Sequence, residues 1–301
     1  MNNIIISFDF ELGWGAVESG RWREREQAGV YESLRPVFRR LITEMDAMGI
    51  PATWATVGAM VSDPCMEDFS HLPISAQQNI ERFLKNASPM TKDGRDLFEI
   101  LLAAKVPHEI ASHSFSHTRF NYPGYDLASQ TDDLKRSISV LEKWTGKKIT
   151  SFVFPQNIAP DFEAVKNAGF EAARISPGKG PLVKRNFIQK IWGYYPHMPA
   201  AATKSTLGPA LILHPSSLFF PGGGGRMPVM RRWSTRLQTM RALRRPANGR
   251  GDTHFWLHPY NLTMVPNLTS HLIVLLRRIA ILRNKKKIVI NTLAQHSFGE
   301  E

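Results

Sequence analysis

Short apolar runs and amphipathic stretches alternate along most of the chain. Runs rich in Ile, Val, Phe and Ala predict strands, and apolar residues at helical spacing predict helices. The expected strands are at 3–9, 52–58, 109–112, 148–154, 172–175, 210–213, 255–257 and 287–293. The expected helices are at 31–48, 126–144, 162–168 and 268–283. Regular alternation indicates a parallel α/β architecture, and seven or eight strands favour a barrel over an open sheet.

Two segments interrupt this alternation within what we expect to be a single domain, 1–301. Residues 59–107 predict two helices, near 76–86 and 95–105, which we interpret as an insertion that shapes the substrate entrance. Residues 216–252 form a basic loop and helix segment that contains four consecutive glycines, 222–225. Because no Lys-Ser/Thr pair follows these glycines, a P-loop is not expected, and a flexible loop near the substrate is favoured.

The first predicted strand ends in two carboxylates, Asp9 and Glu11, ahead of a glycine-rich turn. Alternate strand residues point to the same side, so these two acids share one side and Phe10 faces the other. Carboxylates at the C-terminal end of a first strand are typical of an α/β active site. A solvated acidic strand end is the alternative, and it is less favoured after such an apolar run.

A His-Ser-Phe-Ser-His sequence follows the third predicted strand, with His113 and His117 four residues apart. Residues at this spacing on a helical turn share one face, so both imidazoles can reach one metal ion. Taken alone, the pair is better explained as surface or core-capping histidines. A carboxylate and an acid or base from elsewhere in the chain shift the interpretation towards a metal site.

Composition and the start of the chain bear on location. The only cysteine, Cys65, excludes an internal disulfide and suits a reducing compartment. The first residues have no basic lead or long apolar run, so no signal peptide is expected. No uncharged apolar stretch reaches about 18 residues, so no transmembrane helix is expected. These features predict a cytoplasmic protein.

The net charge of +12 is unevenly distributed. Residues 226–250 hold eight arginines and residues 277–287 hold six lysines or arginines, with no acid in either segment. Without these 14 residues, the remainder has 24 basic and 26 acidic residues. A local basic surface indicates an anionic partner such as phospholipid, lipid pyrophosphate, charged glycan or nucleic acid, and a solvated face is the alternative.

The neighbours of these basic residues narrow the choice of partner. Apolar residues interleave with arginines in 218–245, which favours contact with an anionic membrane or a lipid phosphate. For the second basic segment, an ordinary barrel helix with a basic end is favoured. No nucleic-acid-binding motif is present, so we expect no nucleic-acid partner.

Three motifs together resemble those of the polysaccharide deacetylase superfamily, also called carbohydrate esterase family four and related to the NodB homology domain. They are the strand ending in Ser-Phe-Asp-x-Glu, the His-Ser-x-x-His sequence and a later apolar strand ending in His-Pro. The resemblance extends from Ile4 to about Leu293. It implies a distorted (β/α) barrel of seven or eight strands and metal-dependent hydrolysis of an N-acyl group, usually on an amino sugar.

The resemblance also implies roles for individual residues. Asp9 aligns with the catalytic base, and His113 and His117 align with two metal ligands. Phe10 occupies the position of the family's ligand Asp, so Glu11 is the expected substitute. Two imidazoles and one carboxylate suit Zn²⁺, although Co²⁺, Ni²⁺ or Fe²⁺ would also fit.

Other positions of the family pattern leave alternatives open. The arginine that orients the base is absent from Val153-Phe154-Pro155, so Gln156, Asn157 or Arg174 is expected to replace it. The acid that protonates the leaving amine is expected to be His258, with His214 as runner-up. The expected substrate-binding residues are Trp14, Pro155, Gln156, Asn157 and Arg226.

These inferences predict a hydrolase that removes an acetyl or formyl group from an amino sugar. A lipid- or nucleotide-linked precursor of a surface polysaccharide is the expected substrate, handled at the inner face of the membrane. The alternatives are an allantoinase-like ring amidohydrolase and a glycan- or lipid-binding protein with a degenerate site.

Overall fold

The computed structural model describes residues 1–63, 65–159, 162–176, 205–207, 211–220 and 228–299, with only the backbone at 207 and 228–237. Ten strands of the described chain form one sheet, and every pairing is parallel except that of β6 with β7. The strands are β1 (Asn2–Phe10), β2 (Thr53–Thr56), β3 (Glu109–Ser112), β4 (Ser151–Val153), β5 (Ala172–Ile175), β6 (Ser205–Leu207), β7 (Leu211–Pro215), β8 (Leu218–Phe219), β9 (Thr253–Leu257) and β10 (Ile288–Asn291).

Strand β1 lies at the centre of the sheet, whose order is β6-β7-β5-β4-β3-β2-β1-β9-β8. One edge of β1 pairs with β9, and the other edge pairs with β10 at its start and with β2 at its end. Only two residues separate β7, which pairs with β5, from β8, which pairs with β9. The chain therefore passes from β7, next to one end of the strand order, directly to β8 at the other end, and the predicted distorted barrel is confirmed.

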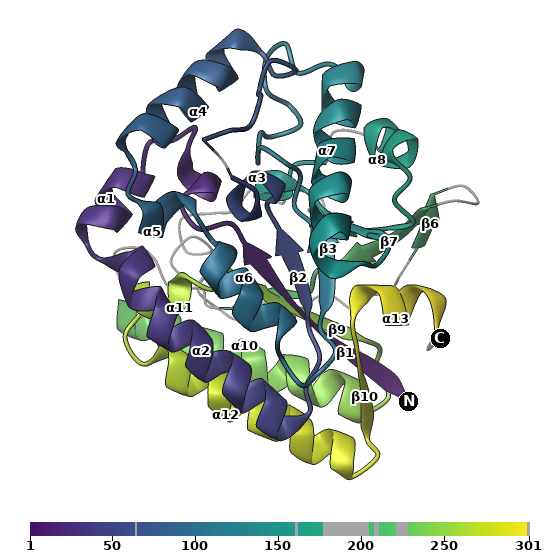
Figure 1. The fold of residues 1–301 in the computed structure, drawn as a ribbon. Helices are drawn as coiled ribbons and strands as arrows, with labels where there is room; N and C mark the ends of the chain where they lie inside the picture. Colours follow the sequence, from purple (N-terminus) through teal and green to yellow (C-terminus); the bar gives the residue numbers. More distant parts are fainter. Residues whose placement is uncertain (64, 160–161, 177–204, 208–210, 221–227, 300–301) are drawn as a thin grey trace, which may run out of the picture.

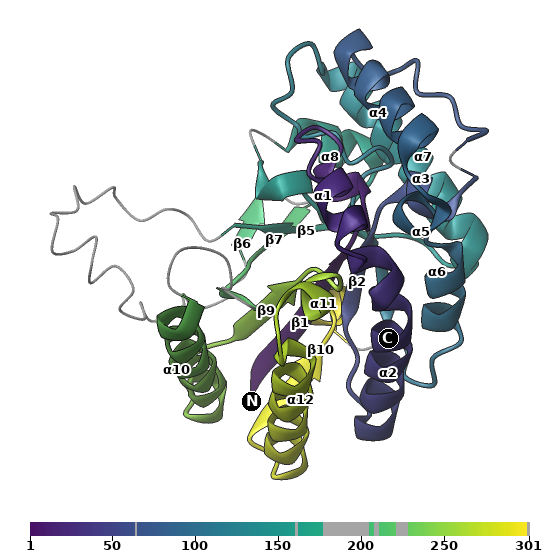
Figure 2. The ribbon, with the colours of Figure 1, turned by 90° about the vertical axis from the view of Figure 1, so that its left-hand side faces the viewer.

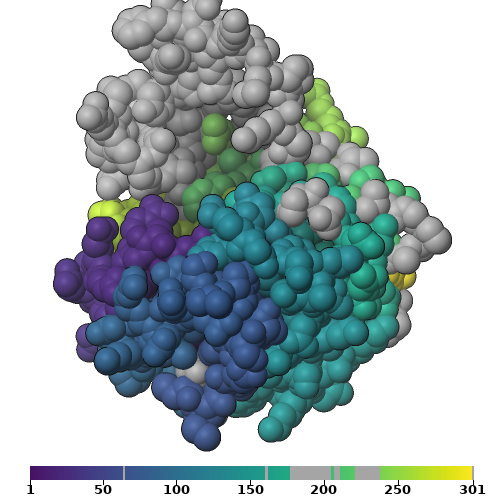
Figure 3. Space-filling view, turned by 90° about the horizontal axis from the view of Figure 1, so that it is seen from above, coloured from purple at the N-terminus to yellow at the C-terminus, as the bar shows by residue number. Residues whose placement is uncertain are grey.

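Helices surround this sheet (Figure 1). Helices α10, α12 and α2 run side by side along the lower part of the molecule, while α4 and α7 lie above α2 (Figure 2). Seen from above, the purple and blue N-terminal part of the chain adjoins the teal segment that includes α7 (Figure 3). The helices are α1 (Trp22–Gln27), α2 (Val30–Met48), α3 (Gly58–Val61), α4 (Ile74–Asn86), α5 (Pro89–Lys92), α6 (Arg95–Leu102), α7 (Leu127–Thr145), α8 (Glu163–Ala168), α10 (Pro228–Ala247), α11 (Asn261–Met264), α12 (Leu268–Asn284) and α13 (Leu293–Phe298).

The side chains of β1 alternate between the helical layer and the barrel interior. Phe8 stacks on Trp54 with ring centroids 4.1 Å apart, and Phe10 packs on Phe38 at 5.4 Å. Such burial of large aromatic groups is a main source of core stability. The intervening Ser7 and Asp9 are buried on the inner side. A polar site is therefore built on an element that is fixed by its outward aromatic face.

The end of the chain differs from the prediction. The last strand stops at Asn291, and α13 begins two residues later. Thr292 caps this helix, because its hydroxyl accepts a hydrogen bond from the backbone N–H of Gln295 and the Gln295 side chain accepts one from Thr292 N–H. This capping box outweighs the apolar run that predicted strand to residue 293. In the described part of the chain, no helix combines the length and apolarity needed to span a bilayer.

Candidate active site

Glu11, His113 and His117 meet at the C-terminal ends of β1 and β3. One ligand atom from each lies within 4.8 Å of the others, and all three residues are buried. The Nε2 atoms of His113 and His117 lie 3.3 and 2.8 Å from Glu11 Oε2. The structure therefore brings together the three metal ligands expected from the sequence.

The donor set fits a divalent metal ion. Both Nε2 atoms are buried and lack a hydrogen-bond partner among the described residues, despite their closeness to Glu11. The Nδ1–H of His113 donates to the Val153 carbonyl at 2.8 Å, which leaves Nε2 as the free lone pair. On the other side, the Tyr260 hydroxyl donates to Glu11 Oε1 at 3.0 Å. Ligands fixed by such outer partners are typical of metal centres.

Electrostatics keep Glu11 ionised. Burial raises the pKa of its carboxyl, but His258, His117 and His113 together hold that pKa well below its usual value. Gly15 permits the close packing of this carboxylate, because a Cβ at that position would lie 1.9 Å from Glu11 Oε1. A residue without a Cβ is therefore required at position 15 for the Glu11 carboxylate to lie where it does.

The loop that carries the two histidines is held from α7. Buried Asp133 accepts hydrogen bonds from the backbone N–H groups of Phe115 and Ser116, at 3.0 and 3.2 Å. The Ser114 hydroxyl accepts one from His117 N–H at 2.9 Å. His117 itself has a φ of 60°, which non-glycine residues rarely adopt. These bonds compensate for an unfavourable backbone conformation.

Strained backbone of this kind concentrates around the site. Five of the seven non-glycine residues with positive φ in the described chain flank it: Leu12, Ser114, His117, Gln156 and Asn157. Residues in sparsely populated backbone regions cost free energy and persist where the surrounding structure requires them. Their clustering marks this end of the barrel as the functional one.

Asp9 is paired with Arg174, which lies inward on β5. The guanidinium donates to both carboxylate oxygens, with distances of 2.6 Å to Oδ1 and 2.7 Å to Oδ2. Burial raises the pKa of Asp9, but Arg174, with smaller contributions from His113 and His258, outweighs burial and the pKa is lowered. Of the three residues left open for orienting Asp9, Arg174 makes the direct contact, and Asn157 accepts a hydrogen bond from Arg174 at 3.1 Å.

Other inward residues hold Arg174 in place. The Ser7 hydroxyl oxygen accepts from Arg174 Nη1 at 3.0 Å and is 2.8 Å from His254 Nε2. The guanidinium carbon lies 4.7 Å from the centre of the Trp256 ring, a cation–π distance. Strands β1, β5 and β9 therefore fix this arginine together.

The two candidate acid histidines occupy different environments. His258 lies in the site, with Nε2 3.4 Å from Glu11 Oε1 and 3.9 Å from Asp9 Oδ2. Its Nδ1 is 3.2 Å from Asn261 Oδ1, an acceptor that leaves Nε2 facing the carboxylates. His214 is buried, with Nε2 2.7 Å from Ser297 Oγ and Nδ1 3.1 Å from His296 Nδ1. The structure brings His258, and not His214, to the carboxylates of Glu11 and Asp9.

A cavity of about 580 Å³ opens onto these groups. Gln156 and Asn157 line it, whereas Pro155 is buried and Trp14 packs against Phe83 and donates its indole N–H to the Lys92 carbonyl. Trp14 therefore serves the core more directly than the cavity. The expected Arg226 lies outside the described residues.

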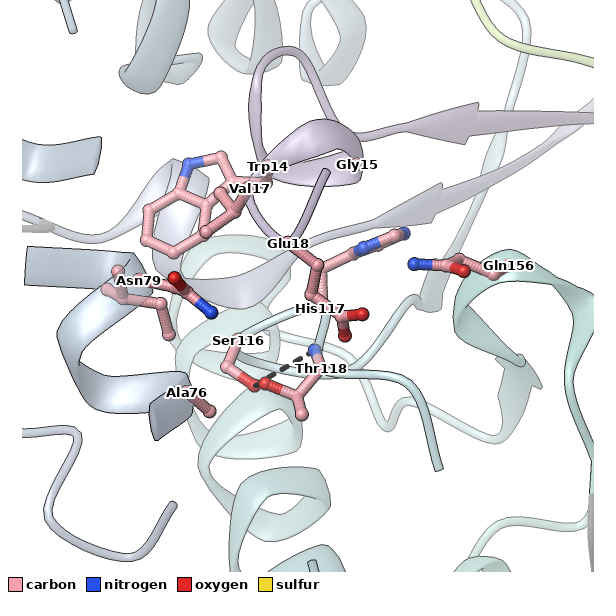
Figure 4. A pocket seen from close by; sticks show the side chains of 11 residues that line it. Trp14, Gly15, Val17, Glu18, Ala76, Asn79, Ser116, His117, Thr118 and Gln156 are labelled. Atoms are coloured by element: carbon pink, nitrogen blue, oxygen red, sulfur yellow. Dashed lines mark hydrogen bonds between the residues drawn. The ribbon is translucent and has the colours of Figure 1, made fainter. Parts of the chain in front are cut away.

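A smaller pocket of about 10 Å³ adjoins His117. Gln156 lies on one side of it, and Trp14 and Asn79 lie on the other (Figure 4). This is about the smallest volume of this kind that can hold one water molecule. The polar side chains of Glu18, Ser116 and Thr118 also line it.

Several residues of the site were not expected from the sequence. Arg21 and Arg25 come from the short helix α1 and the turn before it, and Arg119 follows the histidine loop. Asp133 and Tyr260 contact the loop and Glu11. Only the nearness of Tyr260 to His258 in the sequence was available as a signal.

Comparisons with known proteins agree with this geometry. Residues 30–173 match the family model described as polysaccharide deacetylase. A crystal structure from Mycobacterium smegmatis, named for a polysaccharide deacetylase, has a TM-score of 0.60 at 15% identity, over 98% of this chain and 88% of that chain. The PuuE allantoinase structure has a TM-score of 0.53 at 14% identity, over 99% of this chain and 92% of that chain. At these identities the likeness concerns the fold. No curated protein matches the sequence.

Proposed function

We propose that this chain is a hydrolase of the polysaccharide deacetylase superfamily, whose family model matches residues 30–173, and that it removes an N-acyl group from an amino sugar with the help of one divalent metal ion. The observation that carries this proposal is the convergence of Glu11, His113 and His117 beside an Arg-paired Asp9 and His258, all lining one cavity. A carboxylate base, an imidazole acid and a metal-ligand set are the groups that amide hydrolysis needs.

Glu11, His113 and His117 would hold the ion. A divalent ion bound there supplies Lewis acidity, which polarises the acyl carbonyl and lowers the pKa of water. Zinc suits two imidazoles and a carboxylate, and cobalt, nickel and iron accept the same donors.

Asp9 is the proposed general base. Its lowered pKa keeps it ionised near neutral pH, so that it can accept a proton from the attacking water. Arg174 holds both oxygens of this carboxylate and thereby fixes the direction from which it can accept the proton.

His258 is the proposed general acid. The amine of an amide leaves poorly unless it is protonated, and such a proton transfer contributes roughly 10²–10⁴-fold to the rate. Asn261 orients the ring through Nδ1, and Nε2 faces the cavity side where Asp9 and Glu11 lie.

The proposed substrate is a lipid- or nucleotide-linked amino sugar, deacylated at the cytoplasmic face of a membrane during surface-polysaccharide synthesis. A basic surface supports membrane proximity: Arg241, Arg244, Arg245 and Arg250 line a cavity of about 330 Å³ at the end of α10. We expect the protein to sediment with anionic liposomes at low salt, because such arginines attract lipid phosphates. Replacement of Arg244 and Arg245 should reduce sedimentation, and equal binding to neutral liposomes would contradict this location.

The function is tested by metal analysis followed by hydrolysis assays on N-acetylated and N-formylated sugar donors. The purified protein should contain about one divalent ion per chain, and His113→Ala should lose both the ion and the activity. Full activity in metal-free His113→Ala would overturn the proposal. Hydrolysis of a cyclic amide, with none of an acylated sugar, would instead indicate the allantoinase-like alternative.

The two histidine candidates provide the matched test of the acid. His258→Gln should lose roughly 10²–10⁴-fold in kcat while keeping its metal, since the residue is a proton donor and not a ligand. His214→Gln should keep most of its activity and lose stability, because His214 is buried in contact with Ser297 and His296. The reverse result would exchange the two roles.

A further inference from the structure

Three arginines line the cavity in addition to the residues used above. Arg21 and Arg25 come from the region of α1, and Arg119 follows the histidine loop. The same cavity contains Asp9 and Glu11. The arginines and the reacting groups can therefore touch one bound molecule.

The carboxylates of the cavity do not neutralise all of these arginines. Asp9 is paired with Arg174, and Glu18 is paired with Arg119 at 3.0 Å. Glu11 is surrounded by the imidazoles. Within the described part of the chain, no carboxylate lies within salt-bridge distance of Arg21 or Arg25. Two guanidinium groups thus face the cavity without a carboxylate partner.

Arg25 is the more firmly positioned of the two. Its guanidinium carbon lies 4.6 Å from the centre of the Tyr260 ring. The Tyr260 hydroxyl donates to Glu11, and the His258 ring stacks on Tyr260 with centroids 5.0 Å apart. Arg25 and the proposed acid His258 therefore both contact the Tyr260 ring, whose hydroxyl is hydrogen-bonded to the expected metal ligand Glu11. The Nη1 of Arg25 is buried and makes no hydrogen bond of good geometry in the part of the chain that the structure describes, although Tyr31 and Glu11 are close enough to interact with the guanidinium.

We propose that Arg25, assisted by Arg21, binds a phosphate group carried by the amino sugar. This inference rests on the proposed function, because it assumes that the acylated sugar occupies the cavity. A guanidinium presents a planar fork of N–H donors that matches phosphate oxygens, and such charge-assisted bonds are strong. With the acyl group at Glu11, His113 and His117, a phosphate elsewhere on the sugar fills the anion subsite beside Tyr260.

A purely structural Arg25 would behave differently. If its role were only to cover Tyr260, its replacement would weaken the fold or the Glu11 setting and would affect neutral and charged ligands alike. A phosphate-binding Arg25 changes the preference between ligands that differ only in the phosphate. The test therefore compares matched ligands.

The experiment measures binding of N-acetylglucosamine, N-acetylglucosamine 1-phosphate and UDP-N-acetylglucosamine to the metal-loaded full-length chain by calorimetry. Wild type is expected to bind the phosphorylated sugars about 10- to 100-fold more tightly than the neutral sugar, the range of charge-assisted hydrogen bonds. In Arg25→Gln this preference should fall to near one, with affinity for the neutral sugar unchanged. Arg25→Lys should retain part of it, because it keeps the charge but not the fork.

Arg23→Gln is the matched control. Arg23 lies on the same helix and carries the same charge, but it packs over Trp22 at 4.4 Å and does not line the cavity. It should keep the wild-type preference. Equal losses in Arg23→Gln and Arg25→Gln, or undiminished phosphate preference in Arg25→Gln, would overturn the inference, the latter because the phosphate would then be bound elsewhere, such as at the metal.

Failure of the proposed function is separable from failure of this inference. Binding is measured without turnover, so a chain that hydrolyses no acylated sugar can still show an Arg25-dependent phosphate preference. Conversely, a chain that deacylates neutral and phosphorylated sugars with equal affinity would support the proposed function and contradict the anion subsite. A preference for UDP-N-acetylglucosamine over the 1-phosphate would indicate a nucleotide carrier.

Discussion

Arg174 determines the protonation of Asp9. Both residues are buried, and an isolated carboxylate in such a place would favour the neutral form. The charge and the two hydrogen bonds of Arg174, together with the nearby His113 and His258, reverse this effect. The pair is thus a means of keeping a buried base ionised, and its cost is that removal of one partner leaves an uncompensated buried charge.

Arg174→Gln should therefore raise the pKa of Asp9. Because Asp9 must be ionised to act as a base, the acidic limb of the pH profile of kcat/KM should move to higher pH, by about 1–3 units, the range for loss of a close opposite charge. The loss of activity should be greater at pH 6 than at pH 8. Metal content should remain unchanged, since Arg174 contacts no ligand of the ion.

The variant must remain folded for this comparison, and circular dichroism provides the check. Arg174→Lys retains the positive charge and serves if Arg174→Gln does not fold. An acidic limb that stays in place in both variants would show that Asp9 is not the group that titrates in the profile.

The sequence predicted relations between residues that are close in the chain better than contacts between residues that are distant in the chain. The shared side of Asp9 and Glu11 follows from strand alternation, a local property. The choice of Arg174 over Gln156 and Asn157 could not be made, because it depends on β5 and β1 facing each other across the barrel. Arg25 was missed because α1 has only six residues and no clear apolar period.

At the scale of elements, the histidine loop depends on α7. The loop from His113 to His117 contains two residues with positive φ, and Asp133 accepts two of its backbone N–H groups. Asp133 also contacts His71 Nε2 at 3.0 Å. One buried carboxylate thereby ties the ligand loop, helix α7 and the segment before α4 together.

Asp133→Asn should weaken metal binding. The amide retains one acceptor oxygen but turns an N–H₂ group towards backbone donors, so the loop that places both imidazoles loses part of its support. Loss of a supporting outer contact typically lowers metal affinity about 10- to 100-fold. The measurement is competition for zinc with a chelator of known affinity.

Asp132→Asn is the control for this substitution. Asp132 is adjacent on α7 but half-exposed, and it pairs with Arg136 at 2.8 Å on the helix surface. Exposed pairs of this kind contribute little to stability. Equal metal affinities for Asp133→Asn and Asp132→Asn would mean that the loop holds its shape without Asp133.

Helices were predicted correctly where a long periodic pattern was bounded by a clear capping or stop residue. Helix α2 ends at Gly49, which has a φ of 58°, and α7 begins after Asp126, whose side chain accepts from Ser129 N–H. Helix α13 was missed because its six residues are too few for a period to emerge. Strands β6 and β8 are three and two residues long, and their pairing depends on the barrel rather than on their own sequence.

On the scale of the whole molecule, the two ends of the barrel have different roles. The C-terminal ends of the strands carry the site, whereas α13 packs near the N-terminal end of β1 through a polar chain. His296 Nε2 lies 2.9 Å from Asp252 Oδ2, and Asp252 Oδ1 accepts from Asn3 N–H at 2.6 Å. This carboxylate links the start of β1, the start of β9 and the last helix, and so secures the end of the barrel opposite the site.

Asp252 should make this closure sensitive to acid. Burial raises its pKa, but hydrogen bonds from His296 and Asn3 outweigh burial, and the pKa is lowered in the folded protein. A carboxyl with a depressed folded pKa stabilises the fold above its unfolded pKa, about 3.9, and loses that contribution as the pH falls through the folded value. Asp252→Asn should therefore reduce the free energy of unfolding by about 1–3 kcal/mol at pH 7, the range for charged hydrogen bonds.

The difference between wild type and Asp252→Asn should be constant from pH 7 to about pH 5 and should shrink below about pH 4. Urea unfolding followed by tryptophan fluorescence at pH 7, 5, 4 and 3 measures it. Glu24→Gln, which removes an exposed carboxylate on α1, should leave the free energy of unfolding nearly unchanged at each pH. Because Asp252 lies at the far end of the barrel, kcat at pH 7 should be retained in the folded variant. A destabilisation that persists undiminished at pH 3 would show that the side chain acts through packing and not through its charge.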